Sequence, residues 1–375
     1  MIATPDLIVI GAGPAGSAAA ITAARLGARV TLLERGAFPR HKVCGEFISP
    51  ESIAVLRDLL GESVFAQLVK DAPQITQTRI YLDGATLHAT IKPAALSVSR
   101  YRLDYALWLV AQREGVDCRD EITVEQASRR SAGDLLVTAG AESYLPRCVI
   151  DATGRWSNLR VADSAVPPRD SIWLGIKAHF ATLRKAPASV DLYFFDNGYC
   201  GVQPVEPGLL NACAMVRASC FAGGGGTAGL MARVLQRHPQ LAARSSDWRP
   251  AIEPVATSPL FFRPAVAAHN GILRVGDAAA FIDPFVGDGI SLALRTGVLA
   301  AKCLSDVWRG SAAFDSAAAQ YADAYRRIFA PVFRASARLR RVLTLPRTVR
   351  LPLLHAARLA GLGGYLVSST RPNSV

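Results

Sequence analysis

The stretch that most constrains the fold lies near the start of the chain, where the apolar residues 7–10 (LIVI) run directly into the loop GAGPAG at residues 11–16. Four apolar, mostly β-branched residues in a row predict a buried parallel strand. A helical pattern follows over residues 17–26, and a second apolar strand over residues 29–33 ends in Glu34. Strand, glycine-rich turn, helix and a second strand with a terminal acid, in that order, predict a βαβ unit that binds a dinucleotide.

Each glycine of this loop has a physical task. Gly11 permits the tight turn, Gly13 lets the backbone touch a pyrophosphate, and Gly16 lets the helix pack close to the strand. The start of the helix would offer unpaired N–H groups and a partial positive charge to the phosphates. Glu34 is placed to accept hydrogen bonds from a ribose diol. A tight turn without a ligand is the alternative, but it does not explain the acid at the end of the second strand.

The bulk properties are those of a globular protein rather than a disordered one. Of the 375 residues, 50% are hydrophobic and 19% are charged, which allows two subdomains with substantial cores. No window approaches the ~20 uninterrupted apolar residues of a membrane span, and we see no secretory signal. The seven cysteines are scattered without CxxC spacing, so we expect reduced thiols, no metal site and a cytoplasmic location.

Further along the chain, the pattern alternates between two layers. Residues 35–50 form a long polar connection with glycine and proline, which is typical of a functional loop. A helix is expected over residues 51–60, with Ser49 as its N-cap and Pro50 at its first position. Weak alternation over residues 73–98, around an Asp-Gly turn, predicts a β-hairpin that begins the second layer.

The remainder completes both layers. A helix closed by glycine is expected over residues 99–115, and DATG at 151–154 re-enters the first layer. Strands are expected at residues 116–118, 122–129, 134–138, 172–181, 190–195, 201–204, 209–217 and 272–275. Helices are expected near residues 227–237 and over residues 291–307. The end of the chain is predicted to be helical, with breaks at Pro331, Pro346 and Pro352.

Three boxes in this order carry a family resemblance: GAGPAG with Glu34, DATG at 151–154, and the segment GDAAAFIDPFVGDGI at 276–290. Together they resemble the FAD-dependent oxidoreductases of the para-hydroxybenzoate-hydroxylase-like superfamily. The stretch HKVCGEFISP at 41–50 is similar to its geranylgeranyl-reductase-like branch, which includes prenyl-chain reductases, hydroxylases and relatives of the flavin halogenases. The resemblance covers nearly all of the chain to about residue 305.

The resemblance implies an α/β fold: a Rossmann-like FAD-binding domain, a second, mainly antiparallel β-sheet substrate domain, and a helical C-terminus. The FAD-binding domain would be discontinuous, over residues 1–70, 99–160 and 265–330. The substrate domain would take residues 71–98 and 161–264. Residues 331–375 would form a basic helical tail.

The resemblance also implies roles for residues of the nucleotide half of FAD. Arg100, in the Arg-x-x-x-Asp opening of its helix, would contact FAD, and Val124 would offer its backbone to the adenine. Glu34 and Arg35 would hold the adenosine ribose. The pyrophosphate would lie on Gly11, Gly13, Pro14, Ala15 and Gly16.

At the flavin end, the resemblance places Asp277 on the ribityl chain. The pyrimidine end of the ring would be approached by Pro284, Gly287, Gly289 and Ile290, and the ring would be faced by Cys44 and Gly45. Independently of the family, glycines at 287 and 289 strip side chains from a helix start, which would stabilise the negative charge of reduced flavin by roughly 0.3–2 kcal/mol.

Four acidic or thiol groups in these segments need an interpretation of their own. The Cys44 thiol could form a flavin adduct, pack, or line the pocket, and lining is the interpretation we favour. Asp283 opens either a structural turn or a functional one. Asp288 is expected to point away from the ring, and Asp151 to hold the junction between the layers.

The resemblance implies an enzyme in which NAD(P)H reduces the flavin, and the reduced flavin either reduces a C=C bond or reacts with oxygen to hydroxylate. We expect a small hydrophobic substrate: isoprenoid, polyketide or aromatic. Where prenyl reductases often have Tyr-x-Trp-x-Phe, this chain has GYCGVQP at 198–204. The alternatives are a monooxygenase or halogenase acting on an aromatic or carrier-bound intermediate, and a prenyl-binding escort protein without catalysis.

The net charge of +12 is concentrated at the end of the chain, which has no acid after Asp323 but ten arginines from Arg326 to Arg371. Helical spacing separates an apolar stripe from a basic one. The apolar stripe is Val332, Ala335, Leu339 and Val342. The basic stripe is Arg327, Arg334, Arg338 and Arg341. The basic stripe is either the solvated face of a docked helix or a peripheral contact with anionic lipid. Nucleic-acid binding is not expected, because no aromatic residues interleave the basic ones.

Overall fold

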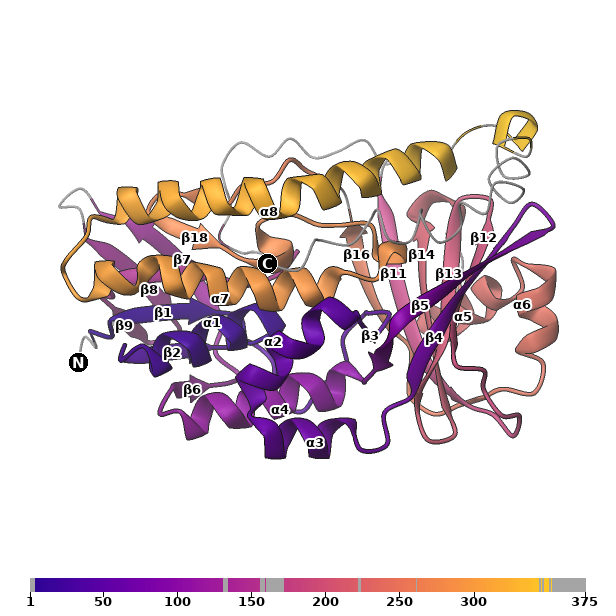
Figure 1. Cartoon of the computed structure of the whole chain (residues 1–375), viewed down its shortest axis with the longest axis horizontal. Coiled ribbons are helices and arrows are strands. Elements are labelled where there is room, and N and C mark those ends of the chain that lie inside the picture. Colours follow the sequence, from indigo (N-terminus) through magenta and orange to yellow (C-terminus); the bar gives the residue numbers. More distant parts are fainter. Residues whose placement is uncertain are drawn as a thin grey trace.

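A computed structural model describes residues 4–130, 134–155, 159, 172–221, 224–260, 262–343, 345, 347–350 and 352 (Figure 1). In this part of the chain the strands form three sheets. A parallel sheet lies toward one end of the long axis and a larger, mainly antiparallel sheet toward the other, with α8 running across both. This confirms the predicted α/β fold class.

The first sheet has the order β17-β18-β10-β1-β2-β6 and is parallel except for β17. Leu7 and Val9 of its central strand pack on the helical side, and Ile8 and Ile10 on the other. Burial on both faces explains why the strand is an unbroken apolar run rather than an alternating one. The strands are β1 (Leu7–Ile10), β2 (Val30–Leu33), β6 (Asp117–Arg119), β10 (Cys148–Asp151), β17 (Ala268–His269) and β18 (Ile272–Arg274).

Five helices cover one face of this sheet; α2 and α4 begin within one residue of the prediction, α1 and α7 begin two or three residues earlier, and α3 was not predicted. Pro14 and Pro50 each occupy the first turn, and the Ser99 hydroxyl accepts the Arg102 N–H at 3.3 Å as a side-chain cap. Ser49 precedes its helix as expected, but its side chain makes no capping bond. The helices are α1 (Pro14–Arg25), α2 (Pro50–Leu60), α3 (Glu62–Val69), α4 (Arg100–Arg113) and α7 (Gly289–Trp308).

A small antiparallel sheet covers the opposite face of the parallel sheet. Its Val137 and Tyr144 pack against Ile8 and Ile10 in one apolar cluster. The strands are β7 (Val124–Arg129), β8 (Leu135–Ala139) and β9 (Glu142–Tyr144).

The large second sheet has the order β15-β11-β14-β13-β12-β4-β5-β3, with β16 paired to β11. Among the described strand pairs of this sheet, only β12 and β4 are parallel. On one face, Met231 and Val234 pack against Ile176 and Tyr193 of the strands. The elements are β3 (Phe47–Ile48), β4 (Gln74–Leu82), β5 (Ala85–Ser97), β11 (Trp173–Ala181), β12 (Ser189–Phe195), β13 (Gly198–Glu206), β14 (Leu209–Arg217), β15 (Arg249–Pro250), β16 (Val255–Leu260), α5 (Gly226–Leu235) and α6 (Pro239–Arg244). The predicted hairpin and strands are confirmed, and the domain boundaries stay a prediction.

The long connection after β2 joins the two sheets. It contains β3, in which Phe47 pairs with Ser97 and Ile48 with Leu96 of β5. This pairing draws the connection out of the parallel sheet and into the large one. The Cys-Gly-Glu segment that precedes β3 therefore lies between the two sheets.

The predicted helix break at Pro331 is wrong, because α8 (Phe314–Leu343) continues through it. The proline ring is exposed, whereas Phe329 and Val332 beside it are buried in the core. Packing of the apolar face thus outweighs the loss of one backbone hydrogen bond. Pro346 lies outside the described residues, and Pro352 has helical geometry. Within the described residues, no helix combines the length and the apolar character needed to cross a bilayer.

Candidate active site

A cavity of about 1370 Å³ lies between the parallel sheet and the large sheet. It brings together segments that are far apart in the chain, and nearly all of the residues singled out from the sequence line it. These are Gly11, Gly13, Pro14, Ala15, Glu34, Arg35, Cys44, Gly45, Arg100, Val124, Asp277, Pro284, Gly287, Gly289 and Ile290.

Gly16 is absent from this lining, and the reason is steric. A Cβ at Gly16 would lie 1.8 Å from the Gly11 carbonyl oxygen, so the residue serves the close packing of α1 on β1. A Cβ at Gly11 would lie 2.5 Å from the Ala152 oxygen, and its φ is +97°. Both positions therefore require glycine for different reasons: packing at Gly16, and turn geometry together with packing at Gly11.

Two helix starts face the cavity. Pro14 opens α1 and Gly289 opens α7, and both residues line the cavity wall. No atom lies within 4 Å of a Cβ built on Gly289, so a side chain there would project into open space. Asp288 is buried. Burial lowers the pKa of the Arg295 guanidinium, and the negative charges of Asp288 and Glu51 oppose this shift. At Gly289 the cavity wall is thus bare backbone, and the N–H groups of a helix start suit an anionic ligand.

Glu34 is held at the end of β2 by three donors. Its Oε2 accepts the Ala12 N–H at 2.9 Å and Arg40 Nη2 at 2.8 Å, and its Oε1 accepts the Gly36 N–H at 3.2 Å. Burial opposes ionisation, but the Arg40 charge and hydrogen bond outweigh it and hold the pKa of Glu34 below its usual value. Glu34 is thus a fixed carboxylate at the nucleotide end of the cavity.

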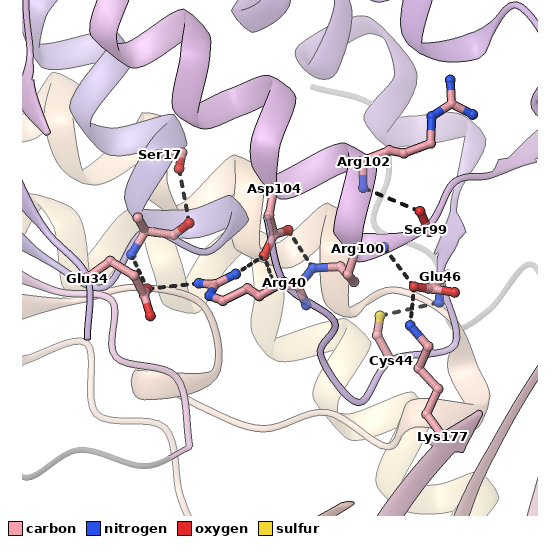
Figure 2. Close-up of polar contacts among 11 residues, drawn as sticks. Ser17, Glu34, Arg40, Cys44, Glu46, Ser99, Arg100, Arg102, Asp104 and Lys177 are labelled. Carbon is pink, nitrogen blue, oxygen red and sulfur yellow. Dashed lines mark hydrogen bonds and ion pairs between the residues drawn. The ribbon is translucent and has the colours of Figure 1, made fainter. Parts of the chain in front are cut away.

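Asp104 joins this carboxylate to the helix that carries Arg100 (Figure 2). Its side chain is fully buried and accepts two bonds from Arg100, at 2.6 and 2.7 Å, and one from Arg40, at 2.8 Å. The two guanidinium groups overcome the effect of burial and keep the pKa of Asp104 below its usual value. Arg40 thereby bridges Glu34 and Asp104 in one continuous ionic chain.

A second buried cluster lies behind the Cys44–Gly45 segment. Glu46 has no exposed surface and a left-handed φ of +61°, an uncommon conformation for a residue with a Cβ. Its Oε1 accepts the Arg100 N–H at 2.7 Å and the Lys177 ammonium, and its Oε2 lies 2.7 Å from His179 Nε2. Burial works to raise the pKa of Glu46, but the His179 bond and the Lys177 charge hold it below its usual value.

These contacts position the loop that faces the cavity. Asn211 Nδ2 donates to the carbonyl oxygens of Cys44, at 3.0 Å, and Gly45, at 2.9 Å. Cys44 Sγ accepts the Glu46 N–H at 3.3 Å, and the thiol lines the cavity. The strained backbone at Glu46 is thus fixed from several sides, as strained residues at functional sites commonly are.

The sequence reasoning missed most of this support. Arg40 lies in an irregular loop, where no periodicity predicts a partner. Lys177 and His179 carried a usable signal, because they are two polar residues spaced by two in an otherwise apolar strand and therefore lie on one face. Asn211 faces them from β14, the neighbouring strand, where it pairs with His179.

Arg155 was also missed, and it connects two of the boxes. It follows the DATG box, and its Nε lies 3.0 Å from Asp277 Oδ2, while its guanidinium stacks 4.2 Å from the Phe281 ring. Arg155 and Asp277 both line the cavity. The second and third sequence boxes therefore meet through an ion pair in the cavity wall.

Asp283 and Asp151 have structural contacts. Asp283 Oδ2 accepts Arg340 Nη1 at 2.8 Å and Ser336 Oγ at 3.4 Å, which ties the third box to α8; burial raises the pKa of Asp283 to about 6. Asp151 Oδ1 accepts the N–H and the hydroxyl of Thr153. Asp283 thus holds α8 to the third box, in keeping with its structural interpretation. Asp151 fixes the turn after β10 and lies 3.6 Å from Arg274 Nε at the end of the neighbouring strand β18, and its predicted role at the junction between the layers stays a prediction.

The opposite end of the cavity is apolar. Phe194, Tyr199 and Phe285 have ring centroids 5.4–6.1 Å apart and line it together with Leu192 and Met215. The volume of about 1370 Å³ exceeds the roughly 300–1,000 Å³ of an ordinary small-molecule site. The cavity can therefore hold a dinucleotide and part of a second molecule.

The comparisons with known proteins agree with this geometry. The family model described as an FAD binding domain matches residues 4–336, most of the chain. The chain belongs to this family. It is an FAD-dependent oxidoreductase of the para-hydroxybenzoate-hydroxylase-like superfamily, in its geranylgeranyl-reductase-like branch, which confirms the resemblance. The glycine cradle, the two helix starts and the paired acids fit FAD.

Among the similar proteins is a menaquinone reductase from Mycolicibacterium smegmatis, 28% identical over 92% of this chain and 86% of that protein. A digeranylgeranylglycerophospholipid reductase from Methanopyrus kandleri is 26% identical over 88% of this chain and 84% of its own. The fold is shared with the flavin-dependent brominase Bmp2, at a TM-score of 0.79 and 20% identity over 98% of this chain and 94% of that one. A geranylgeranyl bacteriochlorophyll reductase-like protein from Thermoplasma acidophilum has a TM-score of 0.75 at 20% identity, over 92% and 89%.

No group of three or more His, Cys, Asp or Glu side chains that could hold a metal ion is found in the described part of the chain.

Proposed function

We propose that this oxidoreductase takes electrons from NAD(P)H and reduces a carbon–carbon double bond in an apolar, isoprenoid-type substrate. The observation that carries the proposal is that one cavity is lined both by the FAD-binding boxes and by the apolar face of the large sheet. Two relatives that cover most of the chain support it, since they are named as a menaquinone reductase and a digeranylgeranylglycerophospholipid reductase.

FAD, when bound, supplies the hydride chemistry. The glycine loop and the start of α1 would hold its pyrophosphate, with Glu34 and Arg35 at the adenosine ribose and Val124 at the adenine. Asp277, oriented by Arg155, would bind the ribityl chain. The start of α7 at Gly289 would stabilise negative charge at the pyrimidine end by roughly 0.3–2 kcal/mol.

The chain's own residues would then orient the substrate and exclude water. Hydrogen bonds and ion pairs of Asn211 and Glu46 hold the Cys44–Gly45 loop, which would keep this part of the cavity wall rigid. Leu192 and Met215 supply apolar surface to the same cavity. A fixed loop and an apolar surface in the same cavity would together orient a flat or unsaturated group.

A second candidate is oxygen-dependent hydroxylation or halogenation of an aromatic substrate. The cluster of Phe194, Tyr199 and Phe285 favours it, because aromatic rings stack in offset or edge-to-face pairs. The reductase is preferred because neither the quinone nor the lipid reductase among the relatives is named for such a reaction.

A visible spectrum of the purified protein, followed by NADPH and NADH oxidation with and without oxygen, tests the proposal. We expect a flavin spectrum and anaerobic oxidation of one nicotinamide that an isoprenoid naphthoquinone accelerates. Product that forms only with oxygen would replace the reductase by the monooxygenase. A colourless protein that does not take up FAD would favour a non-catalytic, prenyl-binding role instead.

We further propose that the protein works in a reducing compartment, the cytoplasm. The six cysteines whose side chains the structure describes are all free thiols. This is the state expected where disulfides do not persist. Peripheral contact with a membrane through the basic tail remains part of this proposal.

A further inference from the structure

The carboxyl-terminal half of α8 forms a roof over the apolar end of the cavity. Pro331, Ala335 and Leu339 line the cavity from this helix. Arg340 fastens the roof, since its guanidinium pairs with Asp283 at 2.8 Å and stacks 3.8 Å from the Phe262 ring. In Figure 1 this half of α8 lies above the strands of the large sheet.

A second ion pair fastens the chain just after this roof. Arg350 donates two bonds to the Asp83 carboxylate, at 2.7 and 2.8 Å, and Asp83 lies at the turn of the β4–β5 hairpin. Leu82 and Leu87 of that hairpin line the cavity. Asp283 and Asp83 are therefore already paired, with Arg340 and Arg350.

Two other arginines of the roof are different. Arg334 and Arg338 both line the cavity and are both exposed, so they stand at its rim. In the described part of the chain neither makes an ion pair or a hydrogen bond, whereas Arg326 on the same helix pairs with Asp323 at 2.6 Å.

The spacing of these two arginines is unfavourable for the protein alone. Residues four apart on a helix are neighbours, and like charges at this spacing destabilise it by a few tenths of a kcal/mol. No acid follows Asp323 in the sequence to compensate. An anion placed between the two guanidinium groups would remove the repulsion and could accept forked hydrogen bonds from both.

We propose that Arg334 and Arg338 bind an anionic group, a carboxylate or a phosphate, at the end of a substrate whose apolar body fills the apolar end of the cavity below α8. This inference rests on the proposed function, because it describes the substrate of the same cavity. It narrows the isoprenoid-type substrate to one that carries an anionic group, of which a neutral isoprenoid naphthoquinone reproduces only the apolar body. The two arginines would determine specificity and orientation without contacting the reacting atoms.

Calorimetric titration of the FAD-loaded protein tests this with matched ligands: decyl phosphate, decanoate and 1-decanol. We expect the two anions to bind roughly tenfold tighter than the alcohol. In the double variant Arg334→Gln/Arg338→Gln this preference should vanish while the affinity for 1-decanol is unchanged. The matched control is Arg326→Gln/Arg327→Gln, which removes two charges from the same helix outside the cavity and should keep the preference.

Equal affinity for the anions and the alcohol in the native protein, or an unchanged preference in the double variant, would overturn the proposal. Co-sedimentation with vesicles of phosphatidylglycerol or phosphatidylcholine separates a lipid surface from a bound ligand. If Arg334→Gln/Arg338→Gln abolished only the vesicle binding, the arginines would serve a membrane contact and the proposal would be wrong. Calorimetry measures binding without turnover. A missing preference for anions would therefore count against this inference, whereas a failure of NAD(P)H oxidation would count against the proposed reductase alone.

Discussion

The two ends of the cavity are built on opposite principles. At the nucleotide end, charges are buried and mutually paired: Glu34, Arg40, Asp104 and Arg100 form a continuous chain (Figure 2). At the substrate end, aromatic and aliphatic side chains form the wall, and the charges at its rim, on Arg334 and Arg338, have no partner among the described residues.

This difference shows how the protein would treat its two ligands. A buried, paired network is costly to disturb and rigid, so the nucleotide end recognises one fixed partner through geometry. An apolar wall discriminates by shape and volume, and a change there alters affinity by smaller steps. The predictions below test this contrast, beginning with the largest effect.

Removing the centre of the ionic chain should cost the most. Asp104→Ala leaves two guanidinium groups near a fully buried position without their shared counterion. We expect the free energy of unfolding to fall by about 3–5 kcal/mol, measured by urea denaturation. Asp306→Ala, which breaks a solvent-exposed pair with Arg309, should cost less than about 1 kcal/mol. Similar losses for both variants would contradict the contrast between buried and exposed charge.

Blocking the start of α7 should break cofactor binding while the fold is kept. A valine at Gly289 would place its side chain in the open space of the cavity. We expect Gly289→Val to weaken FAD binding roughly 100-fold and to purify colourless. Gly224→Val, on an exposed loop with open space around it, is the control and should remain yellow. A Gly289→Val protein that retained its flavin would show that this helix start does not face the cofactor.

Filling the apolar end of the cavity should affect substrate binding alone. Leu192→Trp adds volume to the apolar part of the cavity wall. We expect the KM for an isoprenoid naphthoquinone to rise about tenfold. FAD affinity and the rate of flavin reduction by NAD(P)H should stay the same. Leu183→Trp, at a position that is 99% exposed, serves as the control. Parallel losses of FAD and substrate binding in Leu192→Trp would mean that the two ends do not act separately.

The smallest expected effect is on the pH dependence of FAD binding. Burial lowers the pKa of Lys42, which lines the cavity, to about 8. An anionic pyrophosphate would favour the charged form and raise this pKa, so FAD binding would take up a proton above pH 8. Affinity, measured by fluorescence quenching, should therefore fall a few-fold between pH 8 and pH 9. Lys42→Met should lose this dependence and the exposed Lys70→Met should keep it; a flat profile in the native protein would place Lys42 away from the phosphates.

Much of the nucleotide end could be predicted from sequence because its parts are local. A glycine that must have positive φ, such as Gly11, and an acid that must end a strand, such as Glu34, are set by their immediate neighbours. The continuation of α8 through Pro331 could not be predicted, because burial of Phe329 and Val332 against distant elements outweighs the local preference.

The amino-acid sequence alone determined most of the longer strands and helices and the cofactor class, since periodicity and glycine spacing act over a few residues, whereas short elements such as β3 and β9 were not predicted. Only the tertiary structure decided which side chains support these boxes. Glu46 meets Lys177 and His179 across more than 130 residues of chain, and Arg334 and Arg338 reach the rim of a cavity whose walls come from other segments. Pairings of this kind depend on how whole sheets and helices pack, and local spacing carries no record of that packing.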